Sequence, residues 1–227
     1  MRLFFIILFF SFGFKAQYFK QNRAIFAGAS LSNVIINFDD TTSLKLVSGK
    51  KLGYFIGFTK NYNISDKYFL NARVKFSETG GTVKNSTYFI KTKFPNDLEK
   101  YRNALLKISI YQIAIETSVG VQTNHIRIYG GLQPSLIVFG IYKENHLKSI
   151  EGKPSEEGKD IITNEIKNNI NLFNIKAQAG ITVNISKNYF IDMSYHFGLH
   201  KVASIKAFNN SLNFNQSIIQ IGGGVYF

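Results

Sequence analysis

Apolar residues recur at every second position in eight segments of the chain, a period typical of β-strands with two different faces. In the clearest segment, from Gln112 to Gln122, mostly isoleucine and valine alternate with polar or small residues. The other seven segments span residues 25–31, 52–59, 70–77, 126–136, 173–183, 191–199 and 219–227. The pattern therefore predicts an all-β chain with eight strands.

The links between these segments alternate in length. Short links rich in Asn and Ser occur at residues 61–67, 123–125 and 184–188, and long links span residues 34–51, 78–107, 140–171 and 200–213. An even number of antiparallel strands with short turns at one end and long loops at the other is typical of bacterial outer-membrane barrels. Within the second long link, helical spacing of Leu98, Tyr101 and Leu105 predicts a short helix from Asn96 to Lys107.

The two phases of each segment differ in size as well as in polarity. The apolar phase carries bulky residues, whereas the polar phase carries charged residues and many Gly, Ser and Ala residues. Small and polar side chains suit the interior of a narrow barrel, so we expect the apolar phase to face lipid. This predicts an eight-stranded antiparallel up-and-down transmembrane β-barrel. The alternative is a soluble periplasmic barrel like a lipocalin, which carries an apolar ligand inside.

A targeting segment precedes the strands. Met1-Arg2 is followed by an apolar run from Leu3 to Phe14 and then by Ala16, a pattern typical of a secretory signal peptide. The run is shorter than the ~20 apolar residues of a membrane-spanning helix. We predict a cleavable signal peptide at residues 1–16 and a barrel domain at residues 17–227 in a bacterial outer membrane. An uncleaved anchor helix is the alternative.

Composition narrows the classes of function. The 227-residue chain has no Cys, which excludes disulfides, zinc–thiolate sites and a thiol nucleophile. Its 22 Phe and 12 Tyr residues exclude a disordered chain. A net charge of +13 would favour binding to nucleic acid. A protein of the cell envelope does not encounter nucleic acid, so we expect outer-membrane lipid as its partner instead. Lipopolysaccharide phosphates, or solvent alone, would face the basic residues of the second long link: Lys84, Lys91, Lys93, Lys100, Arg102 and Lys107.

Charged residues within the polar phase predict an ion-pair network in the barrel interior. An eight-stranded barrel is only wide enough for side chains to fill, so an open pore is not expected. A buried charge without a partner is costly, so acids and bases there should pair. The expected members are Arg73, Lys75, Glu116, Arg127, Lys176 and Asp192. The alternative is that these side chains are hydrated and unpaired near the rims.

Catalytic chemistry has one candidate in the sequence. Ser194 and His196 lie two residues apart on one strand, with Asp192 as the nearby acid. A barrel enzyme that cleaves lipid esters needs such a group facing the bilayer, whereas these residues belong to the polar, inward phase. We therefore expect no enzyme and no catalytic residues, with a lipid-active enzyme as the alternative. The four histidines lack metal-ligand spacing, and no phosphate-binding Gly-rich loop leads into a helix, so no cofactor or metal is expected.

The chain ends on an aromatic residue. Gln220, Gly222, Val225 and Phe227 occupy the places of the C-terminal insertion signal of outer-membrane barrels, which implies the barrel-assembly machinery as a partner during insertion. Residues 111–115 (YQIAI) and 128–135 (IYGGLQPS) resemble strands of the PorT-like outer-membrane β-barrel family, although Ala114 stands where that family tends to have proline. The resemblance implies the barrel fold and outer-membrane location. We expect a structural or interaction role, as an anchor, a surface contact or a component of an envelope assembly.

Overall fold

A computed structural model describes residues 22–38, 46–85, 88–91, 98–101, 104–123, 125–145, 170–207 and 210–227. The predicted signal peptide, residues 1–16, lies outside these residues. Among the described residues, no helix is long and apolar enough to cross a membrane. The strands are β1 (Asn22–Phe38), β2 (Leu46–Asn63), β3 (Tyr68–Asn85), β4 (Tyr88–Lys91), β5 (Leu98–Tyr101), β6 (Ala104–Gln122), β7 (Ile126–Asn145), β8 (Phe173–Asn184), β9 (Tyr189–Gly198), β10 (Ala203–Ala207) and β11 (Asn210–Tyr226).

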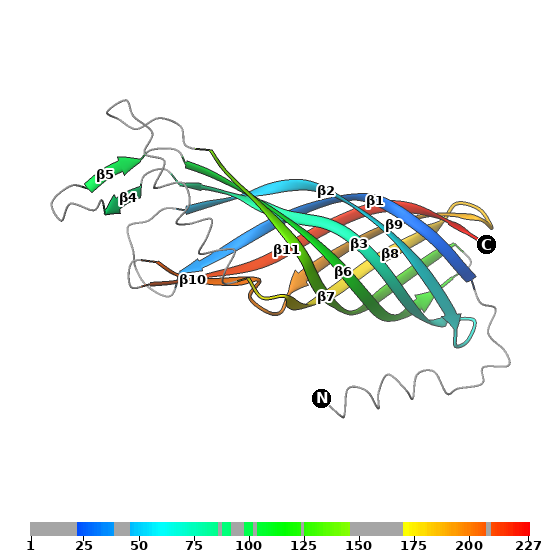
Figure 1. Ribbon diagram of the computed structural model, residues 1–227. Coiled ribbons are helices and arrows are strands. Elements are labelled where there is room, and N and C mark those ends of the chain that lie inside the picture. Colours follow the sequence, from blue (N-terminus) through cyan, green and yellow to red (C-terminus); the bar gives the residue numbers. More distant parts are fainter. Residues whose placement is uncertain are drawn as a thin grey trace.

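The strands form a closed antiparallel barrel (Figure 1). Neighbours pair in the order β1-β2-β3-β6-β7-β8-β9-β11, and β1 pairs with β11 to close the sheet. Because β10 pairs with β11 beyond the stretch that β9 occupies, β9 and β10 together count as one barrel strand. The predicted eight-stranded barrel is therefore confirmed. Strands β4 and β5 form a separate ribbon at the end of the barrel away from the short turns.

The conformation of two of the short turns follows from their sequence. Residues 63–68 (NISDKY) and 184–189 (NISKNY) share one pattern, in which the serine hydroxyl accepts backbone N–H groups from the residues two and three positions later. In both turns the isoleucine N–H donates to the tyrosine carbonyl at 2.9 Å. Serine favours such local bonds, which compete with the strand ladder and reverse the chain. Short turns mark the periplasmic end of an outer-membrane barrel.

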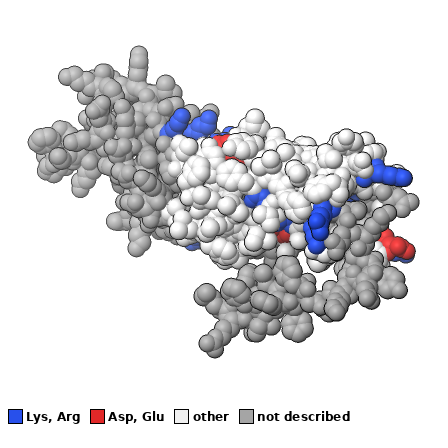
Figure 2. Space-filling model, turned by 45° about the vertical axis from the view of Figure 1, so that its right-hand side comes forward, with Lys and Arg blue, Asp and Glu red and all other residues white. Residues whose placement is uncertain are grey.

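The apolar phase lies on the outside of the barrel. On β6, Ile115 is 54% exposed whereas its neighbour Glu116 is 1% exposed. The same contrast repeats on β9, where Met193 is 50% exposed and Asp192 is 4% exposed. The described barrel surface is accordingly mostly uncharged, with Lys, Arg, Asp and Glu side chains only in a few separate places (Figure 2). The soluble lipocalin-like alternative is wrong, because it requires the opposite orientation of the two phases.

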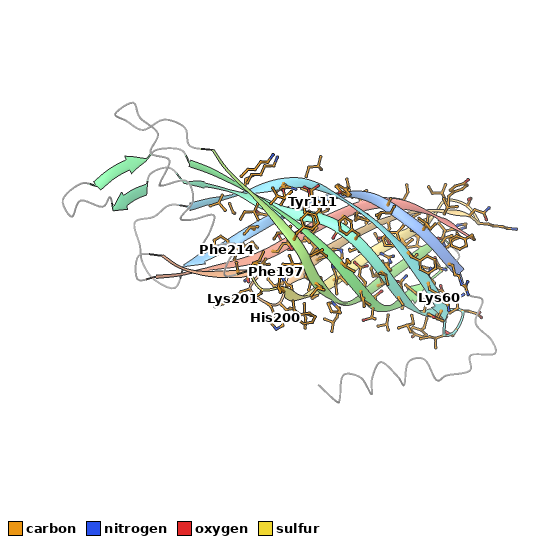
Figure 3. All side chains as sticks on the ribbon, in the orientation of Figure 1. Lys60, Tyr111, Phe197, His200, Lys201 and Phe214 are labelled. Atoms are coloured by element: carbon orange, nitrogen blue, oxygen red, sulfur yellow. The ribbon has the colours of Figure 1, made fainter. Side chains whose placement is uncertain are left out.

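Aromatic residues flank the apolar belt at both ends, as in other transmembrane barrels. Near the short turns, the rings of Phe58 and Phe227 lie 6.1 Å apart. Toward the other end, the Tyr111 ring stacks on Phe139 at 4.3 Å and on Phe76 at 6.2 Å. Figure 3 shows Tyr111 well away from Lys60, which lies at the short-turn end. The membrane-spanning part of the wall therefore lies between these two girdles.

Two expectations about the long links are wrong. The strands extend into all four, so that β3 reaches Asn85, β6 starts at Ala104 and β7 reaches Asn145. Alternation is harder to see there because the outward face of a strand that leaves the membrane meets water instead of lipid, although the backbone pairing continues. The helix predicted from Asn96 to Lys107 is also absent where the structure describes that segment, since residues 98–101 form β5 and residues 104–107 belong to β6. Pairing with a neighbouring strand overrides the helical spacing there.

Candidate functional site

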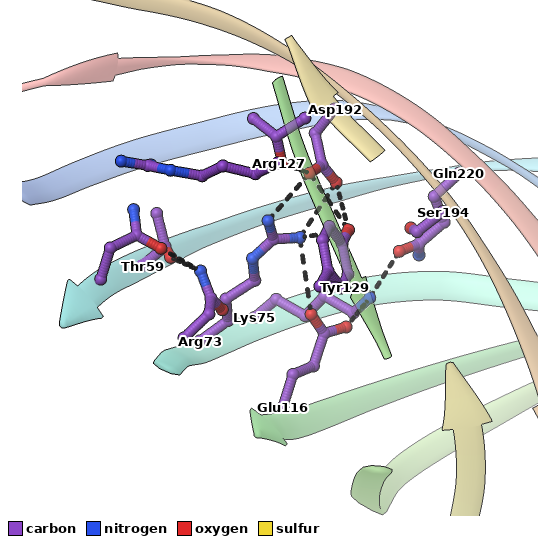
Figure 4. Close-up of polar contacts among 12 residues, drawn as sticks. Thr59, Arg73, Lys75, Glu116, Arg127, Tyr129, Asp192, Ser194 and Gln220 are labelled. Carbon is purple, nitrogen blue, oxygen red and sulfur yellow. Dashed lines mark hydrogen bonds and ion pairs between the residues drawn. The ribbon is translucent and has the colours of Figure 1, made fainter. Parts of the chain in front are cut away.

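The barrel interior gathers the candidate polar residues. Strand β3 contributes Arg73 and Lys75, β6 contributes Glu116, and β9 contributes Asp192, and each of these side chains is at most 5% exposed. They belong to the inward phase because every second residue of a strand points to the same face. Figure 4 shows them converging from different walls of the barrel.

The strongest contact spans the lumen between β3 and β9. The Arg73 guanidinium donates from Nη1 and Nη2 to the two carboxylate oxygens of Asp192, at 2.9 and 2.8 Å. Thr182 donates a further hydrogen bond of 2.5 Å to this carboxylate, and the Tyr129 hydroxyl lies 3.0 Å from it. The Tyr129 and Phe26 rings also lie 4.9 and 5.2 Å from the guanidinium carbon. A two-pronged pair of this kind fixes both direction and distance, so it ties opposite walls together.

A second pair lies beside the first. Lys75 forms an ion pair with Glu116 and donates a 2.5 Å hydrogen bond to Gln220. Arg73 Nη1 lies 3.9 Å from Glu116, which joins the two pairs into one network. Two bases and two acids thus balance each other inside the barrel, as burial of charge requires. Four of the six predicted members are brought together.

The other two predicted members bind neutral partners among the described residues. Lys176 donates to Gln112 at 3.0 Å and to Ser135 at 3.1 Å, and it is fully buried. Arg127 donates to Tyr226 at 2.8 Å and to Gln122 at 3.2 Å, close to the short turns. Hydrogen bonds to neutral oxygens offset part of the cost of burying these cations.

Apolar residues fill the rest of the interior. Beside the network lies an aromatic cluster of Ala24, Phe26, Phe55 and Phe190, with Tyr226 packed against it. Toward the extracellular end lies a second cluster, which we call the outer apolar layer: Val34, Val83, Ile108, Ile110, Ile137, Val202, Ala203 and Phe214. Its members come from β1, β3, β6, β7 and β11, together with β10 and the residue preceding it. The layer covers the polar network from the extracellular side.

Sequence reasoning missed several members of this interior. Tyr129, Gln112, Ser135 and Gln220 all hydrogen-bond to charged groups of the polar phase. Their inward phase was a usable signal, but a hydrogen-bond partner on a distant strand cannot be read from strand spacing. The Lys51–Glu78 ion pair, at 2.5 Å, was also missed because both residues were expected at the limits of long links.

Ser194 and His196 are adjacent but enclosed. The Ser194 hydroxyl lies 2.9 Å from His196 Nε2, and the two residues are 4% and 0% exposed. Asp192, the acid expected beside them, binds Arg73 instead, and His196 Nδ1 has no hydrogen-bond partner in the described part of the chain. The pair lacks both the orienting carboxylate and a path to lipid that ester cleavage requires. No group of three or more potential metal ligands occurs among the described residues.

The proposed insertion signal lies on the closing strand β11. Gln220 is buried and accepts the hydrogen bond from Lys75, whereas Val225 and Phe227 face outward at 46% and 68% exposure. Gly222 pairs with Gly28 of β1 at the seam. These residues therefore have structural places in the closed barrel.

Neisserial surface protein A is similar to this chain at 14% identity over 90% of this chain and 97% of its own, with a TM-score of 0.46. OprG from Pseudomonas aeruginosa has 14% identity over 91% and 95%, with a TM-score of 0.43. Ail of Yersinia pestis has 12% identity over 91% and 98%, with a TM-score of 0.40.

Sequence comparisons identify the family. A search of curated proteins gives no match. The sequence profile of the outer membrane protein beta-barrel domain matches residues 10–204, which is most of the chain. With its closed barrel and apolar belt, the chain therefore belongs to the outer membrane protein beta-barrel domain family and resides in the bacterial outer membrane.

Proposed function

We propose that this protein is a closed-lumen outer-membrane barrel with a structural or interaction role and no enzymatic activity. The observation that carries the proposal is the Arg73–Asp192 pair, which crosses the lumen from β3 to β9. An eight-stranded barrel has room for little more than its own side chains. With the aromatic cluster beside it and the outer apolar layer above it, this interior offers no continuous aqueous path.

Contacts with other molecules then depend on the outside of the barrel. Strands β3, β6 and β7 are 18, 19 and 20 residues long, whereas a tilted strand needs about 9–11 residues to cross the hydrocarbon. The excess length extends the wall beyond the membrane at the end opposite the short turns. An extended wall of this kind suits anchoring, surface contact or a place in an envelope assembly.

The sequence also supports proposals about partners and family branch. Gln220, Gly222, Val225 and Phe227 match the insertion signal that the barrel-assembly machinery recognises, and Phe227 is exposed at the end of β11. Lipopolysaccharide is the proposed lipid partner. Residues 111–115 and 128–135 favour the PorT-like branch of outer-membrane barrels.

Planar-bilayer recording tests the closed lumen. Purified, folded protein should insert without a large, stable conductance, because the Arg73–Asp192 pair and the two apolar clusters block the interior. Heat-modifiable migration on gels should show in parallel that the sample is folded. A large, stable single-channel conductance from folded protein would contradict the proposal.

A further inference from the structure

Three strands carry an aromatic residue near the extracellular limit of the apolar belt. Tyr54 on β2 is exposed and precedes Phe55, which pairs with Ser77 of β3. Tyr111 on β6 pairs directly with Phe139 on β7. We call Tyr54, Tyr111 and Phe139 the aromatic row. Aromatic girdles of transmembrane barrels lie at the membrane interface, so this row marks the extracellular boundary of the hydrocarbon.

The same three strands carry a lysine four residues farther from the short turns. The lysines are Lys50 on β2, Lys107 on β6 and Lys143 on β7, and all three are exposed. An even spacing in a strand keeps residues on one face, so the lysines face outward like the aromatic row. Lys107 pairs directly with Lys143, and also with Thr82 of β3, which in turn pairs with Gly49 beside Lys50. We call these lysines the basic row.

Like charges directly opposite each other on neighbouring strands destabilise a sheet. None of the ion pairs among the described residues involves a lysine of the basic row. Glu78, which pairs with Tyr111 four residues from Lys107, forms its ion pair with Lys51. An anion from outside the chain that bridges the lysines would offset this repulsion through charge-assisted hydrogen bonds.

The height of the basic row fits lipid headgroups. Four residues span about 13 Å along a strand, which is roughly 10 Å along the membrane normal at a strand tilt of about 40°. The headgroup region lies directly beyond the hydrocarbon boundary. Flexible lysine stems can lie along the apolar wall and bring the ammonium groups closer to that boundary.

We propose that Lys50, Lys107 and Lys143 form a binding site for the phosphate groups of a membrane lipid in the outer leaflet, with the aromatic row packing against its acyl chains. The site deepens the proposed lipid contact by naming its residues and chemistry. It rests on the placement of the barrel in the membrane and not on a closed lumen, so the conductance experiment does not decide it.

Native mass spectrometry of the full barrel in detergent tests the site, with bis-phosphorylated lipid A as the probe. The unsubstituted protein should retain this lipid at least about tenfold more tightly than the triple variant K50Q/K107Q/K143Q, since charge-assisted bonds are lost. The control variant K60Q/K67Q/K187Q removes the same charge near the short turns and should retain the lipid. Heat-modifiable migration verifies that all three proteins are folded, which exposed substitutions should permit.

Three results would overturn the proposal. One is equal retention of the lipid by the two variants, which would indicate a general effect of net charge. Another is equal binding of lipid A from which the phosphates have been removed. The third is displacement of the lipid by inorganic phosphate alone at millimolar concentration, which would assign the lysines to free phosphate.

Discussion

At the scale of single residues, Asp192 is the centre of the barrel interior. Its carboxylate accepts hydrogen bonds from both prongs of Arg73 and from Thr182. The charged members of the interior were predictable, because their phase on each strand is visible in the sequence. Their pairing was not, since Arg73 and Asp192 are 119 residues apart and meet only because the barrel is narrow enough for side chains to cross it.

The variant Asp192→Asn should strongly destabilise the barrel. It leaves the buried Arg73 guanidinium with Glu116 at 3.9 Å as its remaining ion-pair partner, and breaking a buried pair on one side costs about 3–5 kcal/mol. Urea unfolding from lipid vesicles measures the loss. The matched control Asp66→Asn lies exposed in a turn and should change stability by less than about 0.5 kcal/mol.

Removing both partners should cost less than removing one. The double variant R73M/D192L replaces the pair with apolar side chains and leaves neither charge unpaired, so it should be more stable than Asp192→Asn. If Asp192→Asn unfolds at the same urea concentration as the unsubstituted protein, the Arg73–Asp192 pair does not stabilise the fold.

At the scale of elements, the seam between β1 and β11 closes the barrel. Gly28 and Gly222 face each other across it, and a Cβ atom on either would collide with a backbone carbonyl and with the ring of Phe55. The small residues of this phase were predicted to relieve crowding inside the barrel. The contact with the Phe55 ring was not predicted. Phe55 comes from another strand, β2, and an aromatic residue in the inward phase departs from the polar pattern.

The variant Gly222→Ala should weaken this seam. The added methyl group forces the strands or the Phe55 ring to shift, at a cost of about 1–3 kcal/mol, so the heat-modifiable band should convert at a lower temperature. Gly130→Ala is the control, since the nearest atom to its added Cβ is a carbonyl oxygen at 3.7 Å. Equal conversion temperatures for the two variants would show that the seam tolerates a side chain.

At the scale of the whole molecule, the protein is an apolar cylinder around a mixed interior, with walls that continue beyond the membrane. The eight strands, their phase and the side that faces lipid could be predicted, because a bilayer imposes a strict alternation wherever it touches the wall. The extracellular extension of β3, β6 and β7 could not be predicted, because the outward positions need to be apolar only where they contact lipid. The outer apolar layer could not be predicted either, since Val34 and Val83 lie in segments that were expected to be links.

Cysteine reactivity in lipid vesicles tests the closed, lipid-facing barrel most directly, because the native chain contains no Cys. Ser118 is 2% exposed in the lumen, and Ile115 on the same strand is 54% exposed on the outside. In the folded barrel, Ser118→Cys should resist a membrane-impermeant maleimide and react only after unfolding. A fluorophore on Ile115→Cys should be quenched by quenchers attached to lipid chains. Rapid labelling of Ser118→Cys in the folded barrel, or the absence of lipid quenching at residue 115, would contradict the account.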